Sequence, residues 1–199
     1  DRAFTALVTA AALVGIVVLL VLLVDVIRDG STMLSLKFLT SFPSQIFPEN
    51  GGIYPAVIGS LWLLGLTALI SVPLGLGAAV YLEEYAEDTR INRIIEINIS
   101  NLAGVPSVIY GLLGLGIFVE LLAPVTGGGS VLTGALTLSL LILPVIIVAT
   151  REALRAIPGS IREGGFALGA TRWEVIWSHL LPMALPGALT GIILALSRA

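Results

Sequence analysis

Side chains that could carry out chemistry are few in this chain of 199 residues. It contains no Cys and a single His, His179, so it lacks the side chains of a Cys/His metal site, a disulfide or a thiol nucleophile. Its single Lys, Lys37, lies between Leu36 and Phe38, so the sequence has no GxxxxGK[ST] loop for the phosphates of ATP. We therefore expect no catalytic residue, no metal site and no nucleotide-binding loop in this chain.

The longest polar stretch, residues 151–179, holds the most regular pattern of the sequence. Ser160 and Glu163 have the spacing of a helix capping box. Apolar residues then recur every three or four positions, as on one face of a helix, and Gly169 interrupts them. These residues are Phe166, Ala170, Trp173, Ile176 and Trp177. A short amphipathic helix of this kind can lie on a membrane, pack under its own bundle or dock in a groove of another protein. Spacing alone leaves these three possibilities open, although packing under the bundle is the commonest.

The composition places these residues in a membrane protein. Hydrophobic residues make up 57% of the chain and charged residues 12%, whereas a soluble domain has about 45–50% and about 25%. So much apolar surface requires lipid as the solvent. Since a spanning helix needs about 20 apolar residues, we expect five spans, near residues 3–24, 56–82, 97–119, 131–150 and 181–199.

Glycine and proline indicate how these helices pack and bend. Gly187 and Gly191 have the GxxxG spacing, which lets two helix backbones approach closely in lipid. Pro73, Pro106 and Pro144 lie within or near spans, where a lost backbone hydrogen bond predicts a kink.

Basic residues predict the orientation of the spans, because Lys and Arg concentrate on the cytoplasmic side. With the N-terminus inside, the outer segments hold Arg28 and Lys37. The inner segments then hold Arg2, Arg90, Arg93, Arg151, Arg155, Arg162 and Arg172. We therefore expect a cytoplasmic N-terminus and a cytoplasmic loop at 151–179. The net charge of −3 and the scattered basic residues give no reason to expect nucleic acid as a partner.

The cytoplasmic loop carries a family resemblance. Glu163-Gly164-Gly165, three residues, Gly169, nine residues and then His179-Leu-Leu-Pro182 resemble the EAA motif (EAA-x3-G-x9-I-x-LP) of ABC importer permeases. Two glycines replace the two alanines and His179 replaces the isoleucine; we interpret this lone His as a residue of the loop–membrane boundary.

The resemblance implies that the loop is a coupling helix that fits a cleft of a separate ATPase subunit. Arg162 and Glu163 would lie at the docking face, and Gly169 would let the two backbones come close. The residues expected to couple to the ATPase are Arg162, Glu163, Gly164, Gly165, Gly169, Ala170, Thr171 and Trp173. ATP and Mg would be bound by that partner, and this chain would hold no cofactor and would not be an enzyme by itself.

Three further segments, 62–85, 95–114 and 194–199, are similar to the A-type (PstA-like) permease subunits of phosphate-specific ABC importers. This resemblance implies an all-α polytopic bundle of the type I importer (MetI-like) kind in a bacterial inner membrane. Residues 1–52 would form an N-terminal transmembrane helix and an external loop, and 53–199 the permease core. The family has six spans, so the sixth is expected beyond Ala199. Implied partners are a C-type permease subunit, an ATPase dimer, a phosphate-binding protein and phosphate. The alternatives are the C-type subunit itself, or a permease for molybdate or sulfate.

Arg198 is the charge that bears most on a substrate. It lies 16 residues beyond Pro182, about 24 Å along a helix, and an unpaired Arg at that depth costs at least about 2.5–3.5 kcal/mol. Geometry alone allows either a polar interior or a side chain that reaches out to the membrane surface. In the phosphate family an arginine in this Ala-Leu-Ser-Arg-Ala context lies on the substrate path, and its fork of donors suits tetrahedral oxygens.

Other polar groups have plainer interpretations. Asn98, Ser100, Asn101 and Ser107 could line a path, but the interpretation we favour is that they satisfy carbonyls at the Pro106 kink. We interpret residues 127–129 as a turn and the 83–84 carboxylate pair as a solvated inner face. An intramembrane protease would need a base within the bundle, and a secondary transporter would be expected to carry intramembrane carboxylates; the expected spans hold almost none.

Overall fold

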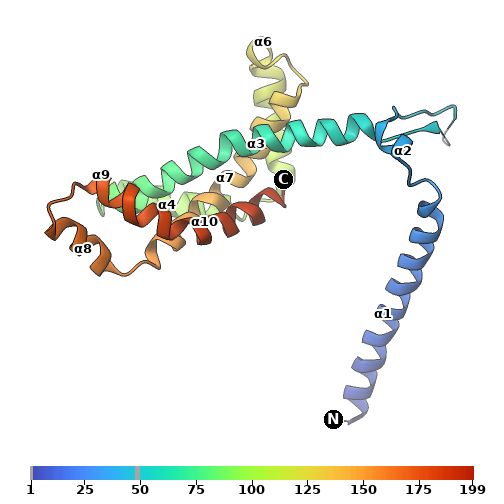
Figure 1. Ribbon diagram of the computed structural model, residues 1–199, viewed down its shortest axis with the longest axis horizontal. Coiled ribbons are helices and arrows are strands. Elements are labelled where there is room, and N and C mark those ends of the chain that lie inside the picture. The colour runs from blue at the N-terminus through green and yellow to red at the C-terminus, as the bar shows by residue number, and fades with distance from the viewer. Residues whose placement is uncertain (1, 48–49) are drawn as a thin grey trace. The chain divides into compact units, whose positions relative to one another are not determined.

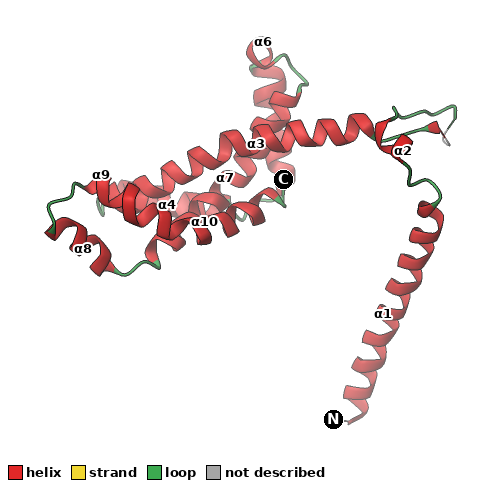
Figure 2. Ribbon diagram, in the orientation of Figure 1, coloured by secondary structure: helices red, strands yellow, loops and turns green. Residues whose placement is uncertain are grey.

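The computed structural model describes residues 2–47 and 50–199, and the regular structure in these ranges is helical (Figures 1 and 2). The chain divides into two compact units, one ending at Ile58 and one running from Gly59 to Ala199. Each unit is described here by itself.

The first unit consists mainly of helix α1 (Arg2–Ser31), none of whose side chains is buried. A helix that is apolar all round and fully exposed needs lipid around it. The short helix α2 (Leu36–Thr40) begins at Ser35, whose hydroxyl accepts the Phe38 N–H at 3.2 Å. The chain then returns to α2, because the Ile53 N–H donates to the Phe38 carbonyl at 2.9 Å. A Cβ on Gly52 would collide with the Ser41 carbonyl, so this close return requires glycine.

Three long helices form the frame of the second unit, and the first of them begins in the residues of the first unit. They are α3 (Tyr54–Val80), which continues as the π-helical turn η2 (Tyr81–Tyr85), α7 (Val131–Arg155) and α10 (Leu181–Leu196). Along α3 and α7, Ser139 donates to the Thr67 carbonyl at 3.4 Å, and Gly75 lies against Ile146. The numbering rises together along both helices, so α3 and α7 run parallel.

Helices α7 and α10 pack closely in opposite directions (Figure 1). A Cβ on Gly187 would lie 3.0 Å from the Ala153 methyl group, and one on Gly191 would collide with Ala149. The GxxxG spacing therefore marks a close helix contact, as expected from the sequence. Pro73 and Pro144 lie inside α3 and α7, which continue through them as single helices.

The span expected near 97–119 is broken. Helix α4 (Arg90–Leu102) and helix α5 (Ser107–Gly114), which continues as the π-helical segment η3 (Leu115–Leu121), meet at an angle of 102°. Pro106 has no N–H to continue a helix, and the residue before a proline avoids helical backbone angles. The kink expected at Pro106 is thus confirmed as a complete break.

Four helical stretches of the described residues are long and apolar enough to cross a membrane, and the broken pair α4–α5 makes a possible fifth. The four are Arg2–Ser31, Tyr54–Tyr85, Val131–Arg155 and Arg172–Leu196. Between η3 and α7, helix α6 (Ala123–Thr126) ends at Gly127, where φ is +77°. Gly128 also has a positive φ, +75°, so the turn expected at 127–129 is confirmed.

Candidate functional site

The loop between α7 and α10 folds into two short helices. Helix α8 (Gly159–Ala167) follows Pro158, and the chain leaves it at Gly169, where φ is +82°. Helix α9 (Arg172–Val175) begins with a capping box, in which Thr171 and Glu174 bind each other's backbone N–H groups. The π-helical turn η4 (Ile176–Leu180) then leads into α10. The capping box expected at Ser160 is therefore wrong, because α8 starts one residue before it.

A small apolar cluster seats this loop on the bundle. Its buried members are Leu154, Ile157, Val175, Ile176, Leu180 and Ala184, and Val80, Ile161 and Ala170 pack against them. Ala170 thus contributes to the seat of the loop. Gly165 also faces inward, since a Cβ there would lie 2.6 Å from Cγ2 of Val175.

The opposite face of the loop is exposed. Glu163 is exposed, and a Cβ on its neighbour Gly164 would meet no atom within 4 Å. Leu168, beside the left-handed Gly169, is 90% exposed. The rings of Trp173 and Trp177 stack 5.6 Å apart, and both remain largely exposed. The exposed groups of the loop therefore include the carboxylates of Glu163 and Glu174 among apolar side chains. Sequence reasoning missed Leu168 because the residue lies off the periodic stripe.

Arg162 points toward the bundle and away from this face. Its Nη2 lies 2.6 Å from Oε1 of Glu84, and Nε contacts both carboxylate oxygens. The remaining donors bind the carbonyls of Leu154 and Ile157, each at 3.1 Å. The hydrogen bonds to Glu84 outweigh desolvation and raise the pKa of Arg162. Arg162 therefore keeps its positive charge beside Glu84.

A second set of ion pairs lies beside the first. Arg151, whose side chain is 9% exposed, contacts Glu83 at 3.2 Å and Glu96 on α4 at 2.6 Å. Arg155 also binds Glu83, at 3.0 Å. The interpretation of Glu83 and Glu84 as a solvated face is therefore wrong, because three arginines from α7 and α8 cover the two carboxylates. The sequence gives both sets of charges but not their partners, which are 55 to 78 residues away.

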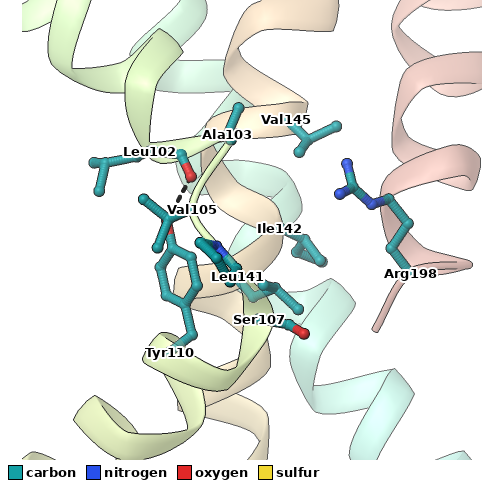
Figure 3. A pocket seen from close by; sticks show the side chains of 11 residues that line it. Leu102, Ala103, Val105, Ser107, Tyr110, Leu141, Ile142, Val145 and Arg198 are labelled. Atoms are coloured by element: carbon teal, nitrogen blue, oxygen red, sulfur yellow. Dashed lines mark hydrogen bonds between the residues drawn. The ribbon is translucent and has the colours of Figure 1, made fainter.

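Arg198 lines a cavity of about 420 Å³ at the break between α4 and α5. Figure 3 shows its side chain across the cavity from the backbone that joins the two helices. Among the described residues its guanidinium group has no hydrogen-bond or ion-pair partner, so its donors are available to a ligand. The other lining residues are 102–107, Tyr110, Leu141, Ile142 and Val145.

Tyr110 is the residue of this cavity that sequence reasoning missed. Its hydroxyl donates to the Leu102 carbonyl at 2.9 Å (Figure 3), and this carbonyl at the break also accepts the Val105 N–H at 3.1 Å. Asn98, expected to serve the kink, binds the Ile94 carbonyl within α4 instead. Ser107 lines the cavity, and His179 is exposed in η4, just before α10.

No group of three or more His, Asp or Glu side chains within the described ranges is placed to hold a metal ion. The arrangement has two candidate functional regions: an exposed loop joined to the bundle by ion pairs, and a cavity at the α4–α5 break faced by an arginine that has no partner in the described part of the chain. Such a pair of regions suits a protein that binds a partner at one end and an anion within the membrane.

Comparison with known proteins adds a family to this geometry. A family model described as "Binding-protein-dependent transport system inner membrane component" matches residues 71–199, which include the loop and the cavity.

Curated relatives align over most of this chain. The "Probable ABC transporter permease protein YqgI" of Bacillus subtilis is 37% identical over 97% of this chain and 62% of its own length. The "Phosphate transport system permease protein PstA 1" of Mycobacterium tuberculosis is 39% identical over 77% of the chain and 50% of its own length. The "Probable phosphate transport system permease protein PstA" of Methanocaldococcus jannaschii is 32% identical over 100% and 68%. The chain thus spans between half and about two thirds of the length of these relatives.

Proposed function

This chain belongs to the family of binding-protein-dependent transport system inner membrane components, and from that premise we propose that it is the membrane permease subunit of an ATP-driven importer of inorganic phosphate. The observation that carries the substrate is the similarity to two phosphate transport permeases, aligned over 77% and 100% of this chain. The alternatives are the C-type phosphate subunit and a permease for another oxyanion such as molybdate or sulfate. As a multi-pass protein, it would lie in a bacterial inner membrane with its N-terminus in the cytoplasm.

The cavity at the α4–α5 break would be part of the substrate path. Arg198 offers paired N–H donors to it, and a guanidinium group binds tetrahedral oxyanions through two parallel hydrogen bonds. An arginine that has no partner among the described residues, beside a cavity lined mostly by apolar residues, also favours an anion over a neutral solute, because its positive charge attracts an anion. The path would open alternately to either side as the spans reorient.

The loop at 158–180 would dock the ATPase. Its exposed carboxylate, Glu163, and the exposed side chains of Leu168 and Trp173 would meet a cleft of that partner. Gly164 and Gly169 leave the backbone accessible on the same side. ATP and Mg would be bound by the ATPase dimer, and a C-type permease and a phosphate-binding protein would complete the importer. Arg162, Gly165, Ala170 and Thr171 would shape the loop from within.

The test is radiolabelled phosphate uptake by cells that carry the complete protein, with co-purification of the ATPase measured in parallel. Arg198→Ala is expected to abolish uptake and keep the ATPase bound, while Arg198→Lys keeps the charge but loses the paired donors. Glu163→Arg is expected to lose the ATPase. Matched controls are Arg90→Ala and Glu87→Arg, which change exposed residues outside the loop and the cavity.

Three results would contradict the proposal at different points. Normal uptake by Arg198→Ala would remove Arg198 from the path. Normal co-purification with Glu163→Arg would remove the loop face from the docking site. Uptake of molybdate or sulfate in place of phosphate would leave an importer of another oxyanion.

A further inference from the structure

The neighbouring carboxylates of η2 bind two different elements. Glu83 pairs with Arg151 and Arg155 on α7, whereas Glu84 pairs with Arg162 on α8. Successive residues of a helical turn project in different directions, so the neighbouring side chains of Glu83 and Glu84 can bind partners on two elements. The end of α3 is therefore tied at once to the bundle and to the loop.

The tie to the loop is directional. Arg162 donates to the Glu84 carboxylate through Nε and Nη2, at 2.6 to 3.3 Å. Its Nη2 and Nη1 also donate to the carbonyls of Leu154, at the end of α7, and Ile157, just beyond it. The Glu84 side chain is 9% exposed and that of Arg162 22%. On the other side of the loop, Arg172 donates to the Glu84 carbonyl at 2.9 Å and lies over the Tyr85 ring. An arginine from each short helix of the loop therefore contacts residues 84 and 85.

We propose that the Glu84–Arg162 pair is the joint that transmits displacement of the loop to α3, with both residues acting as positioning residues for transport. The proposal rests on the proposed function, since an ATPase must move the loop. The chain itself joins the loop to α7 and α10. The loop's side-chain contacts with the helix α3–η2 include the apolar packing of Val80, the contacts of Arg172 with the Glu84 carbonyl and the Tyr85 ring, and this ion pair, which is the contact between two charged side chains. Apolar packing is non-directional, whereas a bidentate arginine–carboxylate pair fixes both distance and orientation.

Displacement of α3 has a route to the cavity. Gly75, about 13 Å along the helix from Glu84, lies against Ile146 of α7, next to the cavity residue Val145. Through Arg151, Glu83 is also held to Glu96 of α4, the helix that leads into the broken span. A pull on residue 84 therefore acts on two walls of the cavity that Arg198 faces.

The experiment reconstitutes the complete importer in proteoliposomes and measures phosphate taken up per ATP hydrolysed. In Arg162→Gln and in Glu84→Gln, the ATPase should stay bound and hydrolyse ATP while this ratio falls about tenfold or more. Arg162→Lys should recover only part of the ratio. Its ammonium group keeps the positive charge, but it cannot form the paired contact with the carboxylate. The matched control is Arg93→Gln, which removes an exposed pair with Asp88 in the neighbouring connection and should leave the ratio unchanged.

Two double variants test whether the pair transmits displacement of the loop or only stabilises the complex. Arg162→Met with Glu84→Met removes both charges together, which should restore the thermal stability of the complex but not the ratio. Arg162→Cys with Glu84→Cys, in a chain that has no other Cys, should recover the ratio once a short bismaleimide joins the two thiols.

Three results would overturn the inference. A wild-type ratio in both Gln variants would show that the pair transmits nothing. Recovery of the ratio by the Met double variant would make the pair purely structural. Absence of phosphate uptake by the wild-type complex would instead overturn the proposed function on which the inference rests.

Discussion

Gly165 shows how one neighbour decides a residue type in the loop. A Cβ at this position would lie 2.6 Å from Cγ2 of Val175, closer than real side-chain atoms approach each other. Val is branched at Cβ and has a stiff χ1, so its methyl group cannot swing away easily. The EAA motif that the loop resembles has alanine here, and Val175 is the physical reason for glycine. Gly164, beside it, has open space.

We predict that Gly165→Ala destabilises the loop by about 1–3 kcal/mol, as overpacking does in a well-packed site. Gly164→Ala is the matched control and should stabilise α8 by about 0.5–1 kcal/mol, because alanine loses less backbone freedom in a helix. Thermal unfolding of the purified protein measures both. Equal effects of the two substitutions would mean that Val175 does not limit position 165.

Thr171 carries a second prediction at this scale. Its hydroxyl accepts the backbone N–H of Glu174 and donates to the Glu174 carboxylate at 2.8 Å. Thr171→Ala should weaken the start of α9 by about 1 kcal/mol, since an N-cap hydroxyl satisfies a helix donor. Thr171→Ser keeps the hydroxyl and should behave as wild type. Hydrogen exchange measures the effect. Exchange at residues 172–175 should be faster than in the wild type for the Ala variant and unchanged for the Ser variant.

Among the elements, the two halves of the broken span are joined by one side-chain hydroxyl as well as by backbone hydrogen bonds. The break between α4 and α5 leaves backbone carbonyls without helical partners inside the membrane, where each such group is costly. Tyr110 reaches eight residues back to the Leu102 carbonyl and remains buried. The cavity wall opposite Arg198 therefore keeps its shape through a side chain of α5.

Tyr110→Phe should lower the free energy of unfolding by about 0.5–1.5 kcal/mol, the net contribution of one hydrogen bond, because the Leu102 carbonyl keeps its bond from the Val105 N–H. Tyr81→Phe is the control, because Tyr81 is exposed and its hydroxyl makes no hydrogen bond within the described residues. Thermal unfolding of the two variants in the same detergent provides the comparison. A Tyr110→Phe protein as stable as the control would contradict the role of the hydroxyl.

The sequence predicts these elements better than their contacts. Apolar length indicates the spans, the GxxxG spacing indicates the α7–α10 contact, and Pro106 indicates the break. The capping box predicted at Ser160–Glu163 is wrong, and the structure has one at Thr171–Glu174 instead. Both pairs fit the same short sequence pattern, and Ser160 cannot cap α8 because that helix already begins after Pro158. The burial of Glu83 and Glu84 could not be predicted, since it depends on arginines brought together by parallel packing of α3 and α7.

At the scale of the second unit, the parallel direction of α3 and α7 determines whether the broken span between them crosses the bundle. The ends of α3 and α7 lie together, since Glu83 binds Arg151 and Arg155. A chain that leaves α3 at one end of the bundle and enters α7 at the other must cross the bundle between them. The segment α4–α5–η3 therefore makes a crossing, and a re-entrant loop would not satisfy this geometry.

Single-cysteine labelling tests this crossing, because the chain has no natural Cys to interfere. Asp88→Cys and Ser160→Cys should both react only after the cells are permeabilised. Gln45→Cys and Gly129→Cys should react in intact cells; all four positions are exposed. Labelling of positions 88 and 160 from opposite sides would contradict the crossing, and labelling of both from outside would reverse the orientation.

The π-helical turns η2 and η4 lie on the two long helices that meet the loop. A π-turn holds one residue more than an α-turn. Closing that extra residue into α-register would rotate all that follows by about 100° and shift it by about 1.5 Å. Each of these helices therefore carries, next to the loop, a place where a small push along the axis can become a twist. The axial displacement needed, about 1.5 Å, is the length of one carbon–carbon bond.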